Sequence, residues 1–226
     1  MPNSTAIEDY LKAIFHLSRD GGRVNTTNLA RQLGVSKPSV TSMLKRLAAK
    51  GLVDYAPGHG GALTEEGRLA TMRVVRRHRL LETFLVEVLH LDWSEVHAEA
   101  EVLEHHLSSR MVDAIDRLLG HPSEDPHGHP IPDAQGRLRA RDLVPLGQLA
   151  AGEHGTVREV RTAEKGRLQR WKELGLVPGA PVAMRAKQDL EDVMHVRVGD
   201  RELATGTEGV DGVFVERSED PWATRS

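Results

Sequence analysis

The chain has 226 residues, 39% of them hydrophobic, which is enough for one large or two small domains with apolar cores. It contains no cysteine, and this excludes disulfides, thiolate catalysis and zinc sites that depend on Cys ligands. No apolar run reaches membrane-spanning length, and the first ten residues lack the basic and apolar regions of a secretory signal peptide. We therefore expect a cytoplasmic protein without a membrane partner.

The formal net charge of −3 conceals a strong asymmetry along the chain. Residues 1–79 contain 13 Lys and Arg against 6 Asp and Glu, whereas residues 80–120 contain 2 against 9. A basic segment suits a polyanion such as DNA, and an acidic segment suits cations.

The N-terminal part of the chain has apolar residues at helical spacing. Three amphipathic helices are predicted, at residues 5–19, 26–33 and 36–50. Gly21 follows the first helix, Thr26 or Thr27 is predicted to cap the second, and Gly34 is predicted to end it. Ser36 is predicted to cap the third helix.

Two helices joined by a tight turn that contains Gly form a helix-turn-helix, whose second helix normally enters the major groove of DNA. Residues 36–50 include four basic side chains and no acidic one, and a short hairpin around Pro57 to Gly61 then predicts the wing of a winged helix. The candidate DNA contacts are small polar and basic side chains of these helices: Thr26, Thr27, Ser36, Lys37, Pro38, Ser39, Thr41, Ser42, Lys45 and Arg46. A three-helix scaffold that binds no DNA is the alternative, which the charge asymmetry argues against.

A long helix is predicted from Thr64, its cap, to about Leu89. Helices at residues 93–107 and 108–119 follow. Apolar side chains of this region exceed what one small core needs, and they predict a homodimer interface: Leu80, Leu81, Phe84, Leu85, Val88, Leu118 and Leu119.

The same helices carry a pattern typical of a metal site. Four side chains of the 93–107 helix fall within an arc of roughly 100°, and two more are four residues apart on the long helix. These imidazoles and carboxylates are His97, Glu101, Glu104 and His105, with His78 and Glu82. A solvated polar face is the alternative, but the arc flanks the apolar stripe of its helix, where carboxylates without a cation would be unfavourable.

Residues 120–139 are rich in Pro, Gly and His, and they predict a loop or linker. We expect no specific metal site at His121, His127 and His129. The remainder predicts a small β-barrel with one helix at residues 164–174 and strands at residues 157–160, 181–187, 193–198 and 212–216.

Several segments of the chain together match one known family: EDYLKAIF, SKPSVTSMLKRLAAKGLV, LTEEGRLA, RRHRLLETFL, VHAEAEVLEHHLS and HGHPIP. Through them the first 140 residues resemble the metal-dependent transcriptional repressors of the diphtheria toxin repressor family. The tail, with its Gly-Leu-Val-Pro-Gly turn, resembles the SH3-like, FeoA-type domain of that family's longer members. The resemblance implies a mainly α fold with a small β domain. Its parts would be a winged helix-turn-helix DNA-binding domain (1–72), a helical dimerisation and metal-binding domain (73–140), an SH3-like β-barrel (141–217) and a tail (218–226).

The resemblance further implies a homodimer that binds a palindromic operator when metal-loaded and represses metal-uptake genes. Neither enzymatic activity nor a small-molecule substrate is expected. Carried over, the primary metal site would consist of Asp9, Glu101, Glu104 and His105. A second site would use His78, Glu82 and His97, although His78 fits either site, and one or two ions per subunit are expected.

The identity of the metal depends on two positions. Iron-type relatives have Met where this chain has Asp9 and Cys where it has Glu101. Two carboxylates make a hard, oxygen-rich site, which favours Mn(II), with Fe(II) or another divalent transition metal as the alternative. Short manganese-type relatives carry Glu at the position of Lys12, and that Glu helps bind a paired metal centre. Because Lys12 cannot do so, a second ion is expected to use Glu82 and His97 instead.

Two other classes of protein remain as alternatives. A metalloenzyme is disfavoured, because no His-Glu-x-x-His occurs and Glu101 stands where the inverted zinc-protease motif needs His. A winged-helix regulator with an organic effector would bind DNA equally well with Mn(II) and with a chelator.

Overall fold

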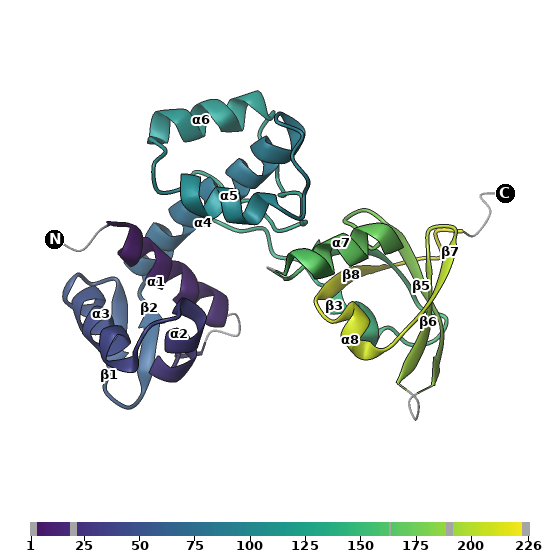
Figure 1. Cartoon of the computed structure of the whole chain (residues 1–226), viewed down its shortest axis with the longest axis horizontal. Helices are drawn as coiled ribbons and strands as arrows, with labels where there is room; N and C mark the ends of the chain where they lie inside the picture. The colour runs from purple at the N-terminus through teal and green to yellow at the C-terminus, as the bar shows by residue number, and fades with distance from the viewer. Residues whose placement is uncertain (1–3, 19–21, 163, 189–191, 223–226) are drawn as a thin grey trace. The chain divides into compact units, whose positions relative to one another are not determined.

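The computed structural model describes residues 4–18, 22–162, 164–188 and 192–222 (Figure 1). Its chain forms two compact units, one from residues 1–78, 101–114 and 132–138, the other from residues 79–100, 115–131 and 139–226. Residue 19 of the first predicted helix, Gly21 after it, and residues 223–226 of the tail lie outside the described residues.

The N-terminal part of the first unit contains the three predicted helices, α1 (Ser4–Leu17), α2 (Thr26–Leu33) and α3 (Lys37–Ala49), which lie together in Figure 1. They surround an apolar core in which Ile14, Leu29, Val40, Leu44 and Leu47 are fully buried. Burial of this many aliphatic side chains, at about 1.5–3 kcal/mol each, is what holds the three short helices together.

Two of the predicted helix boundaries are confirmed and one is wrong. Ser36 caps α3 by accepting a hydrogen bond from the amide of Ser39, and Gly34 ends α2 in the left-handed conformation, with φ 64°. The cap of α2 is Asn25 and neither threonine, because Asn25 has extended backbone and its side-chain oxygen accepts the amide of Asn28 at 2.8 Å.

The predicted wing is the antiparallel pair β1 (Val53–Ala56) and β2 (Gly60–Leu63). The side chain of Arg23 holds the two strands: Nη1 donates to the Asp54 carboxylate at 2.7 Å, while Nε and Nη2 donate to the backbone carbonyls of Asp54, His59 and Gly60. One guanidinium thus fixes both strands of the wing and the turn between them.

Helix α4 (Glu65–Glu87) begins at the predicted cap, since Thr64 Oγ1 accepts the amide of Gly67 at 3.0 Å. Helix α5 (Val96–Leu103) is shorter than predicted, with turns on either side of it, and α6 is Ser109–Leu118. Leu80, Leu81 and Leu85 are buried within the protomer, so they are not available as the predicted dimer surface. In the described part of the chain, no helix is both long and apolar enough to cross a membrane.

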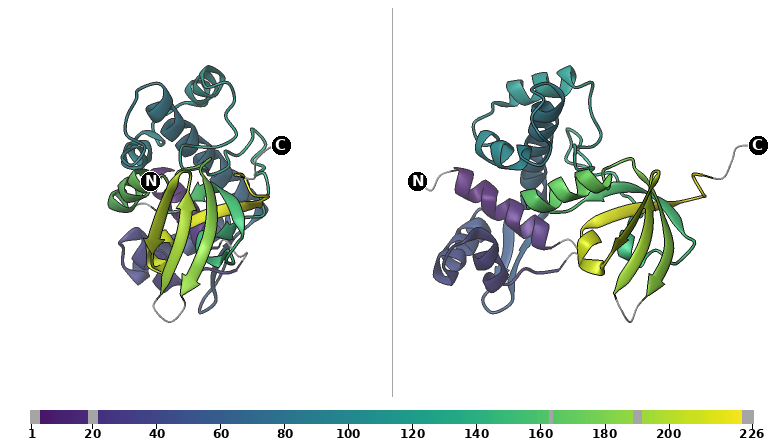
Figure 2. Two further views of the ribbon diagram at one scale, coloured as in Figure 1. Left: turned by 90° about the vertical axis from the view of Figure 1, so that its right-hand side faces the viewer. Right: turned by 45° about the vertical axis from the view of Figure 1, so that its right-hand side comes forward.

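The second unit contains a six-stranded antiparallel sheet with the order β3-β8-β4-β5-β6-β7, seen from two further directions in Figure 2. The strands are β3 (Val144–Pro145), β4 (His154–Val160), β5 (Pro181–Gln188), β6 (Val193–Val198), β7 (Arg201–Thr205) and β8 (Val213–Ser218). The predicted helix is α7 (Lys165–Leu174), and short turns of helix lie at Leu146–Gln148 (η1) and Thr207–Val210 (α8). Trp171 of α7 is fully buried in the apolar core of this unit.

Part of the Pro, Gly and His-rich segment is a packed loop rather than a linker. The amide of Val160 on β4 donates to the carbonyl of His127 at 2.9 Å. At Gly128, where φ is 83°, a Cβ atom would come within 1.8 Å of the carbonyl oxygen of Arg158. The loop therefore approaches β4 as closely as only glycine permits.

This close approach predicts that Gly128→Ala destabilises the protein by more than about 2 kcal/mol, because both the backbone strain and the clash with Arg158 are unavoidable. Urea unfolding followed by circular dichroism measures the loss. Gly166→Ala on α7 is the control: its Cβ meets nothing within 4 Å, so stability should stay the same or rise by up to about 1 kcal/mol. Equal stabilities for the two variants would contradict this account of the loop.

Candidate metal centre and nucleic-acid interface

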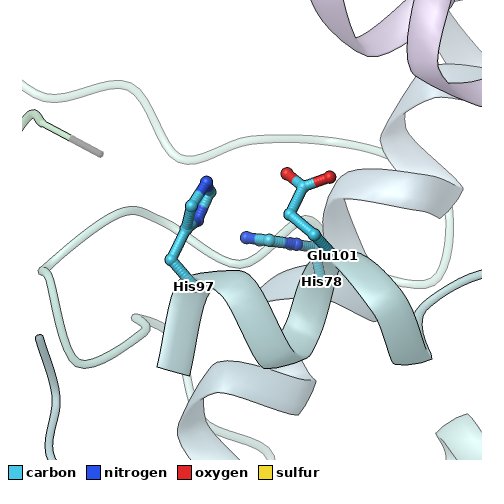
Figure 3. Close-up of side chains that lie close together, drawn as sticks. All are labelled: His78, His97 and Glu101. Carbon is cyan, nitrogen blue, oxygen red and sulfur yellow. The ribbon is translucent and has the colours of Figure 1, made fainter. Parts of the chain in front are cut away.

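Five of the predicted metal ligands lie together in the first unit, where α1, α4, the end of α5 and the turn after it supply them. We call this group, together with a lysine, the first-unit cluster: Asp9, Lys12, His78, Glu101, Glu104 and His105. Ligand atoms of Asp9, Glu104 and His105 lie within 4.8 Å of one another, and so do those of His78 and Glu101. Figure 3 shows His78 on α4 and Glu101 on α5, with His97 one helical turn before Glu101.

Glu104 is the centre of this cluster, and its side chain is 0% exposed. Its Oε1 accepts a hydrogen bond from Lys12 Nζ at 2.7 Å, and its Oε2 lies 2.6 Å from His78 Nδ1. Burial alone would raise the pKa of Glu104, but the hydrogen bond and charge of His78, with the charge of Lys12, lower it. The carboxylate is thus ionised although it is completely removed from solvent.

Lys12 and Asp9 respond differently to the same surroundings. Burial alone would lower the pKa of Lys12, but the charges and hydrogen bonds of Glu104 and Glu101 raise it, so the side chain is an ammonium. Burial raises the pKa of Asp9, and His105 and Lys12 only partly oppose this. The positive charge near Asp9 therefore offsets the effect of its burial only in part.

His105 is oriented by a residue that the sequence did not single out. Its Nδ1 lies 2.8 Å from Glu8 Oε2, which also forms an ion pair with Arg77 Nη2 at 2.7 Å, and its Nε2 lies 3.1 Å from Asp9 Oδ1. A ring that donates Nδ1–H to a carboxylate keeps the lone pair on Nε2, which is the usual arrangement of a metal-bound histidine and its supporting carboxylate. No local sequence signal links Glu8 to His105, which is 97 positions away.

The other two predicted ligands belong to a group of acids and histidines in the second unit, which we call the second-unit cluster: Glu82, His97, Asp125, His127, His129 and Glu159. Glu82 is buried, with one oxygen 3.1 Å from His97 Nδ1 and the other 3.7 Å from His127 Nδ1. His129 lies 3.1 Å from Asp125 through Nδ1 and 3.7 Å from Glu159 through Nε2. His127 and His129 thus lie among acids that could hold an ion, and the expectation of no specific metal site at these histidines stays a prediction.

The loop that carries these histidines is shaped by Asp125. Its Oδ1 accepts the amides of His127 and His129, both at 2.9 Å, and ligand atoms of the three residues lie within 4.8 Å of one another. His127 Nε2 donates to the carbonyl of Trp93 at 2.9 Å, which directs Nδ1 toward Glu82. Burial would lower the pKa of His127, but Glu82 and Asp125 raise it. The sequence signal that could have indicated this loop is the Asp-x-His-x-His spacing of residues 125–129, because an Asp side chain often accepts amides of the turn that follows it.

The donor chemistry of both clusters fits a hard divalent cation. Every donor is a carboxylate oxygen or an imidazole nitrogen, and the chain has no cysteine to add a thiolate. Buried carboxylates that lie this close need positive charge, and oxygen with nitrogen donors suit metals such as Mn(II), Fe(II) and Zn(II) more than soft ions.

The exposed side of α3 offers the predicted nucleic-acid contacts. Ser36, Lys37, Pro38, Ser39, Ser42 and Lys45 are exposed, and so is Thr27 near the start of α2, whereas Thr26, Thr41 and Arg46 are half-buried. An open hollow of about 460 Å³ at this helix is lined by Tyr10, Pro38, Ser39, Ser42, Met43 and Arg46. The face thus combines hydroxyl groups with basic side chains, which suits base edges and phosphates.

Large apolar side chains are exposed in both units. In the first unit they include Val102, Leu103 and Met111, and in the second Val88, Leu89, Leu91 and Leu118. A group of this kind is a candidate interface with a second copy of the chain.

Comparison with known proteins agrees with this geometry. Residues 4–61 match the family model of the iron-dependent repressor N-terminal DNA-binding domain, residues 64–133 that of the iron-dependent repressor metal-binding and dimerisation domain, and residues 144–217 that of the FeoA domain. These matches confirm the resemblance that was drawn from the sequence.

Individual relatives include proteins named for iron and for manganese. The chain is 33% identical over 189 residues to the iron-dependent repressor IdeR of Mycobacterium tuberculosis, covering 78% of this chain and 82% of that one. It is 40% identical over 109 residues to the transcriptional regulator MntR of Escherichia coli O157:H7, covering 48% and 70%. A solved manganese-dependent transcriptional repressor in complex with manganese is 34% identical, with a TM-score of 0.86 over 94% of this chain and 100% of that chain. The chain therefore belongs to the diphtheria toxin repressor family of metal-dependent transcriptional repressors, which are DNA-binding proteins and not enzymes.

Proposed function

We propose that this protein is a Mn(II)-responsive repressor that binds a palindromic operator as a homodimer and controls metal-uptake genes. The observation that carries the choice of metal is the first-unit cluster, in which Asp9 and Glu101 supply carboxylates beside the buried Glu104. An oxygen-rich donor set is hard and suits Mn(II). A manganese-dependent repressor among the similar structures supports the choice, while the iron-dependent relatives make Fe(II) the competing metal.

The proposed ligands connect the DNA-binding helices to the helices that follow α4. Asp9 belongs to α1, which packs on α2 in the same core as α3, whereas Glu101, Glu104 and His105 lie at the end of α5 and just beyond it. When bound, a divalent cation supplies the charge that lets Asp9 and Glu104 remain close. In its absence their mutual repulsion opposes the hydrogen bond by which Lys12 holds α1 to Glu104, and this weakens the position of α1 and of α3. A coupling free energy of ~1–3 kcal/mol between metal binding and DNA binding would change operator affinity about 5- to 150-fold.

A second ion, in this proposal, uses the second-unit cluster. Glu82 and His97 are the ligands expected from the sequence, and Asp125 and His127 extend the set with buried groups. This gives one or two ions per protomer. The functional division that we propose is residues 1–72 for DNA, 73–140 for dimerisation and metal, and 141–217 for the barrel. A repressor must reach the DNA that it controls, so we infer a cytoplasmic location.

The proposal predicts that duplexes from promoters of metal-uptake genes bind tightly with Mn(II) and weakly with chelator, at fixed salt. Asp9→Ala and Glu101→Ala should remove most of that difference, because each deletes one of the proposed ligands, whereas Glu99→Ala, on the exposed side of α5, should retain it. Fluorescence anisotropy with Mn(II), Fe(II) and Zn(II) in turn measures it. DNA binding that is equally tight with chelator and with each metal would refute the proposal. An increase in affinity with Fe(II) alone would mean that the regulatory metal is iron and not manganese.

Contacts of α3 with phosphate predict a change in salt dependence. Lys37→Ala, at the exposed start of α3, should weaken binding to specific and non-specific duplexes alike and lower the slope of log K against log salt by about 1. Arg110→Ala on α6, also exposed, is the control and should leave the slope unchanged. An identical slope for wild type and Lys37→Ala would place this end of α3 away from the DNA.

The lowered pKa of Glu104 predicts how the metal-free protein responds to acid. A carboxylate whose folded pKa lies below its unfolded value of 4.5 stabilises the fold fully above pH 4.5 and loses this contribution as the pH falls through the folded pKa. In Glu104→Gln the buried Lys12 loses a partner, which should cost about 3–5 kcal/mol at pH 7. The difference in the free energy of unfolding between wild type and Glu104→Gln should shrink below about pH 4.5, because Glu104 then becomes protonated. Urea unfolding in chelator from pH 7 to pH 3 measures it, and a constant difference across that range would contradict the prediction.

A further inference from the structure

The outer face of the six-stranded sheet carries a row of three residues on neighbouring strands. In the register of the sheet, Ala183 of β5 lies opposite His154 of β4 on one side and opposite Arg197 of β6 on the other. Because side chains alternate along a strand, Ala183 faces away from the apolar core that contains Val182 and Met184. Ala183 is nevertheless only 1% exposed, so other side chains must cover it.

Trp222, beyond the end of β8, lies over this row. Its ring centroid is 6.3 Å from that of His154, and the guanidinium carbon of Arg197 lies 4.3 Å from the ring, within the range of a cation–π interaction. Trp222 thus contacts both residues that flank Ala183 in the sheet, and its indole accounts for the burial of that alanine. Nε of Arg197 donates to the carbonyl of Gly199 at 3.0 Å, which holds the guanidinium in place for the ring.

Asp220 turns the chain back over the sheet. Strand β8 ends two residues before it, at the register partner of His154. Asp220 Oδ1 accepts the amide of Trp222 at 2.9 Å and lies 3.7 Å from His154 Nε2. Pro221 stands between the two residues, and its fixed φ restricts the turn further. Residues 219–222, which we call the tail segment, thus present an acidic and an aromatic group to the row.

The tail segment is attached to the barrel by side chains. Among the residues that the structure describes, no backbone hydrogen bond joins residues 219–222 to a strand. The two attachments, the cation–π contact of Trp222 and the ion pair of Asp220, are each weak at a partly exposed position. An aromatic anchor beside charged residues is typical of interfaces between separate molecules, and contacts of this strength exchange readily.

We propose that the outer face of the barrel at His154, Ala183 and Arg197 is a binding site for peptides that carry an acidic residue two positions before a tryptophan, and that the tail segment is its resident ligand. The docked segment covers the site in cis. When it leaves, the site accepts a segment of the same chemistry from another molecule. None of the three residues belongs to either metal cluster or to α3, so this surface is independent of the proposed function.

The length of the connection determines the affinity that docking requires. Asp220 follows the end of β8 by two residues, so the tail segment is held near the site at an effective concentration on the order of millimolar. A segment that stays docked at this local concentration has a dissociation constant in trans below about 1 mM. A free peptide of the same sequence should therefore bind measurably once the tail segment is removed.

The first test measures binding in trans. The probe is a synthetic peptide, SEDPWATRS, which has the sequence of residues 218–226. It is added to the full chain and to a shortened chain that ends at Ser218. The shortened chain should bind it with a dissociation constant below about 1 mM, seen as shifts of the amide resonances of His154, Ala183 and Arg197 in nuclear magnetic resonance spectra. The full chain should bind it at least about tenfold more weakly, because its own tail segment fills the site.

Two substitutions examine the anchor of the peptide. Trp222→Ala in the peptide should weaken binding to the shortened chain about tenfold or more, and Arg197→Ala in the shortened chain about threefold or more. Arg170→Ala on α7, where the side chain is exposed, is the control and should leave the affinity unchanged. No saturable binding to the shortened chain, equal binding to both chains, or an affinity that is insensitive to Arg197→Ala would each overturn the inference.

A second measurement follows the docked segment in the intact chain by acrylamide quenching of tryptophan fluorescence. Trp93 and Trp171 are 8% and 1% exposed, so the difference between a chain and its Trp222→Ala counterpart reports the quenching of Trp222. Arg197→Ala should increase this quenching, because the ring loses the guanidinium that covers it, whereas Arg170→Ala should not. Quenching of Trp222 that is the same with and without Arg197 would also overturn the inference.

Discussion

The ionised carboxylate of Glu104, fully enclosed between Lys12 and His78, is the constraint on which the first unit depends. An unpaired charge at this position would cost several kcal/mol, so the helices that carry its partners must remain where they are. Through Lys12 it fixes α1, and through His78 it fixes α4. Helix α1 shares an apolar core with α3, which offers the DNA contacts. The ion pair of one buried side chain therefore also affects the position of α3.

In the second unit the buried acids have Arg79 as a cationic neighbour, with Nε 3.8 Å from Asp125 Oδ2, and a loop places the histidines among them. Asp125 folds residues 125–129 around its carboxylate, and the carbonyl of His127 joins the loop to β4. The histidines are thereby placed beside Glu82 and Glu159, which come from a helix and from the barrel. The barrel thus takes part in forming this group of acids and histidines.

Local signals predicted most of the helical architecture. Helical spacing, the caps Ser36 and Thr64 and the turn at Gly34 gave boundaries close to those observed, because each acts within one turn of the chain. Helix α5 was predicted too long, since its flanking turns contain helix-compatible residues. Strand β3 is two residues long and pairs with β8, about 70 positions away, and the largely exposed β7 has no apolar alternation, so neither had a local signature.

The candidate site was predictable only in part, because several of its contacts join residues that are far apart in sequence. Helical periodicity grouped Glu101, Glu104 and His105, but the support of His105 by Glu8 joins residues that are far apart in sequence. Lys12 was recognised as unable to bind metal, yet its bridge between Glu101 and Glu104 depends on how α1 packs against the end of α5.

The absence of sulfur from the donor set has a consequence for chemical damage. Oxidants that convert thiolates to sulfenic and sulfinic acids disable metal sites built on cysteine. Carboxylates and imidazoles do not undergo that reaction, and this chain has no thiol at any position. A regulator built in this way would continue to report metal levels during peroxide stress, when a relative with a cysteine ligand would lose its signal.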